Sequence, residues 1–160
     1  MKITIKDLFE ARENLPKLAG IQDVPVKIGY WIAKLVRKLN EPLRDAEAAR
    51  NNLVKKYSIP PEEEERQRLE LEGRLGEIEK KPKSAANKDE KKLIEVALVN
   101  LKSLKNRVLD ENLEKFSNEL SELTREEVDI DIDIIKLPND IKLPDASVLI
   151  GIDNFFEIEG

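Results

Sequence analysis

Three aspartates spaced two residues apart are the residues of this sequence best suited to chemistry. Asp129, Asp131 and Asp133 alternate with isoleucines in the segment EEVDIDIDIIKLP. Carboxylate oxygens are the ligands that calcium and magnesium prefer, and paired carboxylates can serve as general acid and base. The triplet is therefore a candidate metal site and, more remotely, the centre of a metal-dependent hydrolase.

The strict alternation of apolar and acidic residues predicts a strand over residues 127–135, with all three aspartates on one face. Same-face neighbours on a strand lie about 6.5–7 Å apart. That separation is too large for the three carboxylates to share one ion without ligands from elsewhere. We therefore favour a half-buried strand whose outer charges prevent edge-to-edge pairing.

Two residue types that many enzymes use are missing from the chain. It contains no histidine and no cysteine, which excludes Ser-His-Asp and Cys-His nucleophiles, zinc sites with nitrogen or sulfur ligands, and disulfides. Glu126 and Glu127 end the helix before the strand, and no pocket is evident around them. We expect a non-enzymatic protein without a cofactor.

The beginning of the chain lacks an apolar stretch of signal-peptide length, and no apolar run approaches a membrane span. We expect a cytoplasmic protein that does not enter the membrane.

Basic residues gather in the N-terminal part of an otherwise acidic protein. Residues 1–57 hold twelve Lys and Arg against seven Asp and Glu, whereas residues 110–160 hold four against fifteen. A nucleic-acid or partner-binding face would consist of Lys34, Arg37, Lys38, Arg44, Lys55 and Lys56. A pI near 5.1 argues against a dedicated nucleic-acid binder, so we favour a solvated face or packing against the acidic half.

The N-terminal elements are expected to be a short strand and a short helix. Residues 2–6 alternate like a strand, and Asp7 is a plausible N-cap for a helix that places Leu8 and Leu18 on one face. Pro16 falls inside this pattern, so the helix is expected to stop or kink near Asn14.

Residues 25–57 are expected to form one long helix. Apolar residues recur at alternating four-residue and three-residue steps from Ile32 to Tyr57, a coiled-coil-like seam that packs against another helix. The seam keeps its phase across Pro42, which favours a continuous, kinked helix. Arg50 is the one polar interruption of the seam, and one alternative is that it is buried and paired with a carboxylate such as Glu114 or Glu119.

Four large side chains in the helical seams have two interpretations. They form either part of the core, which we favour, or the lining of a ligand groove: Tyr30, Trp31, Val36 and Phe116.

Residues 60–92 are charge-dense and poor in large apolar side chains, so we interpret them as a partly mobile insertion. They would contain a short helix or a β-ribbon tip, with a mobile loop over residues 80–88. A second long helix is expected over residues 89–123. Its apolar stripe shifts by about one residue near Leu113. This helix and the helix of residues 25–57 would form an antiparallel hairpin.

The C-terminal part completes an α+β, mainly α fold in a single domain of residues 1–160. The N-terminal strand is expected to pair with the strand of residues 127–135. A turn over residues 137–140 and a short extended piece over residues 141–143 follow. Residues 144–156 are expected to form a last helix that docks through Phe155 and Phe156, because it is too apolar to be a free tail.

Three segments of the chain resemble a known family: KITIKDLFEARENLPKLA, VPVKIGYWIAKLVRKLNEPLRDAEAARNNLVKKY and FSNELSELTREEVDIDIDIIKLPNDIKLPDASVLIGIDNFF. In this order they resemble small proteins of tailed phages and prophages that share a domain of unknown function. The resemblance leaves out residues 62–92 and carries no catalytic residue. It implies a phage or prophage protein that acts in the cytoplasm of the host cell.

We therefore expect an interaction or assembly protein that acts through helical surfaces and binds a phage or host protein. The alternative is a nucleic-acid-binding accessory protein that uses the basic face of residues 34–56. Two long helical seams with few apolar residues to cover them also predict a homodimer.

Overall fold

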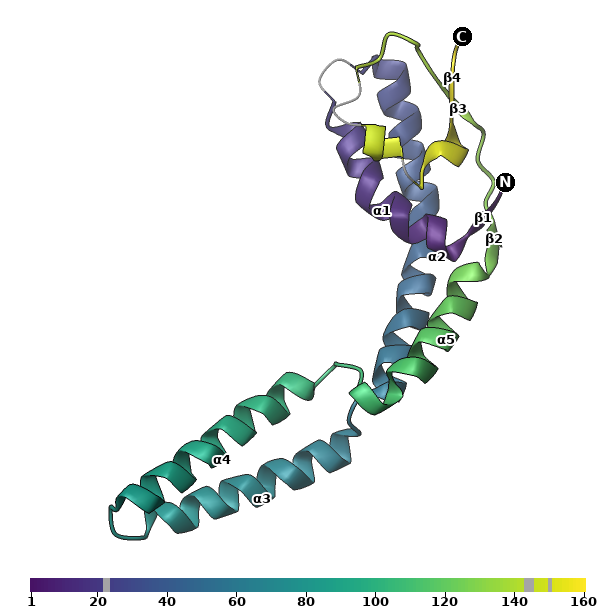
Figure 1. Cartoon of the computed structure of the whole chain (residues 1–160). Helices are drawn as coiled ribbons and strands as arrows, with labels where there is room; N and C mark the ends of the chain where they lie inside the picture. Colours follow the sequence, from purple (N-terminus) through teal and green to yellow (C-terminus); the bar gives the residue numbers. More distant parts are fainter. Residues whose placement is uncertain (22–23, 143–145, 150) are drawn as a thin grey trace. The chain divides into compact units, whose positions relative to one another are not determined.

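The computed structural model describes residues 1–21, 24–142, 146–149 and 151–160 (Figure 1). The chain divides into two compact units. Unit 1 comprises Met1–Arg50 and Leu120–Gly160, and unit 2 comprises Asn51–Glu119. The chain length predicts a single domain, in which the two units would unfold together, and this stays a prediction.

Unit 1 begins with the predicted pairing of two distant segments. Strand β1 (Lys2–Thr4) lies antiparallel to strand β2 (Glu127–Asp129), with Ile3 opposite Val128. Ile3 is buried, whereas Lys2 is exposed. The pairing of the N-terminal strand with the start of the aspartate segment is therefore confirmed.

Helix α1 (Ile5–Ala19) begins earlier than its sequence pattern predicted, and Thr4 is its N-cap. The hydroxyl of Thr4 accepts a hydrogen bond from the backbone N–H of Asp7 at 3.1 Å, and the Asp7 carboxylate accepts one from the backbone N–H of Thr4. These two bonds form a capping box. The prediction of Asp7 as the N-cap was therefore wrong, because its carboxylate supports the cap from the third helical position.

Helix α1 also continues past Pro16 to Ala19, so the prediction that it stops near Asn14 was wrong. A proline removes one backbone donor from a helix. Here the helix loses only the bond that an N–H at position 16 would have made, and it ends three residues later at Ala19. Leu15 and Leu18 on either side of it are buried in the core, and their burial favours the helical conformation.

Helix α2 (Val26–Tyr57) is continuous through Pro42, as predicted. The predicted seam is buried or half-buried along its length, and it is joined by Leu35 and Ile28. The unit 1 part of α2 packs with α1 and the C-terminal segments into one apolar cluster. Its most deeply buried members are Leu8, Ala11, Leu18, Ile32, Leu35, Leu137, Ile152 and Phe155.

The aspartate segment is not one strand but two, and this corrects the predicted strand of residues 127–135. After β2 ends at Asp129 the chain is irregular until strand β3 (Ile135–Leu137). Strand β3 pairs in parallel with strand β4 (Phe156–Ile158) in a second two-stranded sheet. The burial pattern changes phase at the Ile134-Ile135 doublet, because Ile134 is 53 % exposed while Ile135 is buried.

The C-terminal segment docks on the core as predicted, but as turns and a strand. The described residues form the 3₁₀ turns η2 (Ala146–Leu149) and η3 (Asp153–Phe155), followed by β4. Val148, Ile152 and Phe155 are buried. Backbone bonds at three-residue spacing, such as the one from Ile152 to Leu149 at 3.1 Å, replace the predicted helix of residues 144–156. Residues 143–145 lie outside the described part, so the extended piece of residues 141–143 is not tested in full.

Unit 2 contains an antiparallel hairpin of helix α3 (Pro61–Glu79) and helix α4 (Ala85–Leu104) (Figure 1). Of the two predicted alternatives for this segment the helix is confirmed, although it is longer than expected, and the loop ends at Ser84 and not at residue 88 because α4 begins at Ala85. Pro61 stands at the helix start, where its missing N–H costs nothing, and Glu63 and Glu70 both form ion pairs with Arg66 along α3. Ser84 caps α4 by accepting a hydrogen bond from the Asn87 N–H at 3.2 Å.

The predicted helix of residues 89–123 is interrupted. Helix α4 ends at Leu104, and after the 3₁₀ turn η1 (Asp110–Asn112) helix α5 (Leu113–Arg125) begins. Asn106 has a left-handed backbone at φ 60°, which a continuing helix does not allow. The break explains the shift of the apolar stripe near Leu113, and it makes α4 the partner of α3 in the hairpin.

The α+β, mainly α fold class is thus confirmed, with a helical hairpin of different composition from the one predicted. The described part of the chain contains no helix that is long and apolar enough to cross a membrane.

Candidate functional site

The three candidate metal ligands are exposed and have separate surroundings. Asp129 forms an ion pair with the N-terminal amine at 3.2 Å, and Asp131 forms one with Lys38 at 3.4 Å. Asp133 lies instead on the wall of a groove beside Trp31. Within the described ranges, no three acidic side chains are placed to hold a metal ion together.

The predicted basic face does not form one free surface. Lys34 lies over the Trp31 ring at 4.6 Å from its centroid, and Lys38 reaches both the carboxylate and the backbone carbonyl of Asp131. Arg37 donates a hydrogen bond to the Ala33 carbonyl at 3.4 Å.

The remaining members of the face are in different surroundings. Arg44 lies at 4.0 Å from Asp45, and Lys56 pairs with Glu119 at 2.7 Å. Lys55 and Lys56 belong to unit 2, while the other four basic residues belong to unit 1.

Arg50 is exposed, so the prediction of a buried Arg50 paired with Glu114 or Glu119 was wrong. Its guanidinium lies 5.9 Å from the centroid of the Phe9 ring.

The four large side chains that the sequence suggested as part of the core or as the lining of a ligand groove do not form one group. Trp31 and Val36 pack against the unit 1 core, whereas Tyr30 is 57 % exposed and its ring stands edge-on to Trp31. Phe116 belongs to unit 2, where its ring meets that of Tyr57 at 6.4 Å.

A hydrogen-bonded cluster in unit 2 joins the end of α2 to α5. The Glu119 carboxylate accepts hydrogen bonds at 2.7 Å from both Lys56 Nζ and Tyr57 Oη. The Tyr57 carbonyl in turn accepts bonds from the Leu109 N–H at 3.0 Å and the Asn112 side chain at 3.2 Å. The sequence contained no sign of this cluster, because Glu119 is one of many acidic residues on an amphipathic helix.

The three groups of this cluster shift one another's protonation. The hydrogen bonds from Lys56 and then Tyr57 lower the pKa of Glu119. The bond to Glu119 raises the pKa of Lys56, and the same carboxylate and then burial raise the pKa of Tyr57. Each group is held in the charge state that it already has at neutral pH, which is the behaviour of a structural clamp and not of a proton-transfer site.

Unit 1 carries a groove between α2 and the segment around β3. Its larger part has a volume of about 460 Å³. Apolar side chains form most of the lining, and two lysines and two acidic residues complete it. The lining residues are Pro25, Lys27, Ile28, Trp31, Asp133, Ile134, Ile135, Lys136, Pro138 and Glu159.

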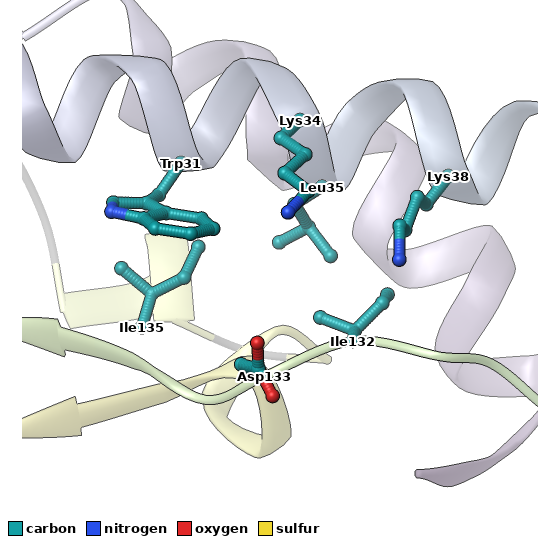
Figure 2. A pocket seen from close by; sticks show the side chains of 7 residues that line it. All are labelled: Trp31, Lys34, Leu35, Lys38, Ile132, Asp133 and Ile135. Atoms are coloured by element: carbon teal, nitrogen blue, oxygen red, sulfur yellow. The ribbon is translucent and has the colours of Figure 1, made fainter.

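A second, narrower hollow continues this groove along α2 toward Lys38. Figure 2 shows Trp31 facing Ile135 across it, with Lys34 and Lys38 following on the helix. Both hollows share the side chains of Trp31, Asp133 and Ile135. We call the two hollows together the Trp31 groove.

Unit 2 carries an exposed apolar face on α4. Leu93, Val96 and Val99 are 70 %, 50 % and 68 % exposed, although Ile94 and Leu101 on the opposite side of the same helix are buried. An open hollow of about 430 Å³ lies between α3 and α4 and is lined by Leu71, Ala97, Leu101 and Leu104, among others. We call Leu93, Val96 and Val99 the α4 face.

The sequence pattern did not predict the α4 face, because only one apolar stripe was assigned to this helix. The signal was present in the segment LIEVALVNL, whose apolar residues occupy all sides of a helix. Such a helix is normally covered all round.

No protein-family model matches this chain, and neither a curated protein nor a solved structure shows significant similarity to it.

Proposed function

We propose that this protein is a non-enzymatic interaction or assembly protein, and that the α4 face of the hairpin binds a second copy of the chain. The observation that carries the proposal is that α4 buries one apolar side against α3 and presents another to solvent. Apolar surface removed from water stabilises an association by about 25 cal/mol per Å².

A second copy is the simplest cover for this face, because a two-fold axis places equal apolar faces together. Helix α4 has 20 residues, which corresponds to a length of about 30 Å. The α4 face lies on the side of α4 away from its buried contact with α3, so α4 alone presents roughly 300 Å² per copy if a helix is about 10 Å wide. The total of about 600 Å² is below the size of stable specific interfaces, so we expect a weak, reversible dimer in which the α4 helices of the two copies pack together.

The test is the molar mass measured by light scattering and sedimentation over a hundredfold range of protein concentration. We expect the mass to rise from one 18.3 kDa chain toward twice that value. The variant Val96→Gln/Val99→Gln should weaken the association at least tenfold. Glutamine has a higher helix propensity than valine, so the helical circular dichroism should not fall.

The matched control is Leu69→Gln on α3, because Leu69 is 57 % exposed but lies outside the α4 face. Its dimerisation should equal that of the wild type. Leu101 is unsuitable as a test position, since it is buried within the hairpin and Leu101→Asp would unfold the helices. A monomer at every concentration would contradict the self-association.

A phage or prophage origin and a place in the host cytoplasm belong to the same proposal, and the resemblance of the three segments is their support. The nucleic-acid alternative has less support, because Lys38 and Lys56 of the predicted face are paired with carboxylates.

A further inference from the structure

The Trp31 groove has a wide hollow and a narrow continuation, and both follow α2. Its two hollows run beside residues 27–38 of α2. The wide hollow of about 460 Å³ lies beside residues 25–31, whereas the narrow one has only about 20 Å³, room for about one water molecule. A ligand would therefore sit in the wide hollow and extend over the narrow one.

The floor of the groove offers apolar contact that the fold leaves uncovered. Trp31 is half-buried, and Ile134 is 53 % exposed on the opposite wall. Tyr30, next to Trp31 on α2, is also exposed and stands edge-on to the indole at 5.5 Å between ring centroids. Large aromatic side chains of this kind contribute most of the binding energy in protein interfaces.

The charge of the groove is opposite to that of the whole protein. Four lysines line it, Lys27, Lys34, Lys38 and Lys136, against Asp133 and Glu159. Asp131 pairs with Lys38 beside it, which leaves an excess of one positive charge in a chain of net charge −5. Within the part of the chain that the structure describes, Lys27 and Lys136 are exposed and form no ion pair. These two lysines stand on opposite walls, one on α2 and one on β3.

We propose that the Trp31 groove binds an extended, acidic peptide segment of a partner protein. Apolar side chains of the peptide would lie against Trp31 and Ile134, and its carboxylates would meet Lys27 and Lys136. Charge complementarity of this kind selects the partner and speeds the encounter. The site lies in unit 1 and its occupancy does not depend on the α4 face.

The test begins with a selection of random dodecapeptides on the full-length protein. A parallel selection uses the variant Lys27→Glu/Lys136→Glu. We expect the wild type to enrich peptides that combine Asp or Glu with aliphatic or aromatic residues. Trp31 is the single tryptophan of the chain, so titration with tryptophan-free enriched peptides should shift its fluorescence to shorter wavelengths.

Two variants separate the charge from the apolar contribution. Lys27→Glu/Lys136→Glu and, separately, Ile134→Ser should each weaken binding at least tenfold, while Lys17→Glu/Lys142→Glu, with the same change in net charge outside the groove, should not. The four replaced lysines are exposed and Ile134 is half-exposed. The variants should therefore fold, because none of the substitutions changes a buried side chain. Failure to enrich any peptide, enrichment of basic or uncharged peptides, or equal binding by the groove and control variants overturns the proposal.

Discussion

Replacement of Gly151 by alanine tests the docking of the C-terminal turns on α1. Gly151 has a left-handed backbone at φ +74°, and a Cβ atom at this position would lie 2.2 Å from the Cβ of Glu10. The left-handed conformation costs a non-glycine residue about 1–2 kcal/mol, and forced overpacking costs about 1–3 kcal/mol more. We expect Gly151→Ala to lower the free energy of unfolding by about 2–5 kcal/mol, because Cβ of Glu10 is fixed to the helix backbone.

The control is Gly29→Ala in the same unit, where nothing lies within 4 Å of the added Cβ and the backbone is helical. This variant should raise the free energy of unfolding by about 0.5–1 kcal/mol. Urea unfolding followed by the fluorescence of Trp31 reports on unit 1, which contains both glycines. Glu10→Ala should not rescue Gly151→Ala, since it keeps the clashing Cβ. A Gly151→Ala protein as stable as the wild type would refute the positive φ and the close approach to α1.

Three further predictions concern the cap, the clamp and the aspartates. Thr4→Ala should lower the free energy of unfolding of unit 1 by about 1 kcal/mol, whereas Thr4→Ser, which keeps the hydroxyl, should lower it much less. If urea unfolding showed the same decrease for both variants, the capping box would be excluded. The pKa of Glu119 is lowered by Lys56 and Tyr57, so its contribution is present above the ordinary pKa of 4.5 and is lost as pH falls through the folded value. Stability between pH 6 and pH 3 should therefore fall more steeply in the wild type than in Glu119→Gln, and parallel curves in acid denaturation would contradict the clamp. Millimolar calcium or magnesium should leave the melting temperature unchanged; an increase that disappears in Asp131→Asn would revive the metal hypothesis.

The sequence determined the elements whose periodicity is local. The seam from Ile32 to Tyr57 specified one helix through Pro42, since burial of a continuous apolar stripe outweighs the single hydrogen bond that a proline removes. The alternation around Asp129 likewise identified a strand with acidic outer positions, and β2 pairs with β1 as expected. The apolar character of the C-terminal segment was sufficient to predict that Phe155 is buried.

The sequence also contains two local changes in the pattern of apolar residues that mark where an element ends. The doublet Ile134-Ile135 marks the change from one buried face to the other, and a single strand over residues 127–135 ignores it. The stripe shift near Leu113 marks the break between α4 and α5 in the same way. At each of these two places the apolar pattern shifts by one residue. In a strand, a shift by one residue exchanges the buried and the exposed face.

Only the tertiary structure decided which surfaces meet. A charged helix such as α5 offers several carboxylates with the same local pattern, so its periodicity could not show that Glu119 meets Lys56 and Tyr57. The Trp31 groove likewise exists because β3 turns to pair with β4, which leaves Lys136 across from Lys27. Periodicity specifies which side of an element is apolar, whereas the angles of the intervening turns decide which distant residues face that side.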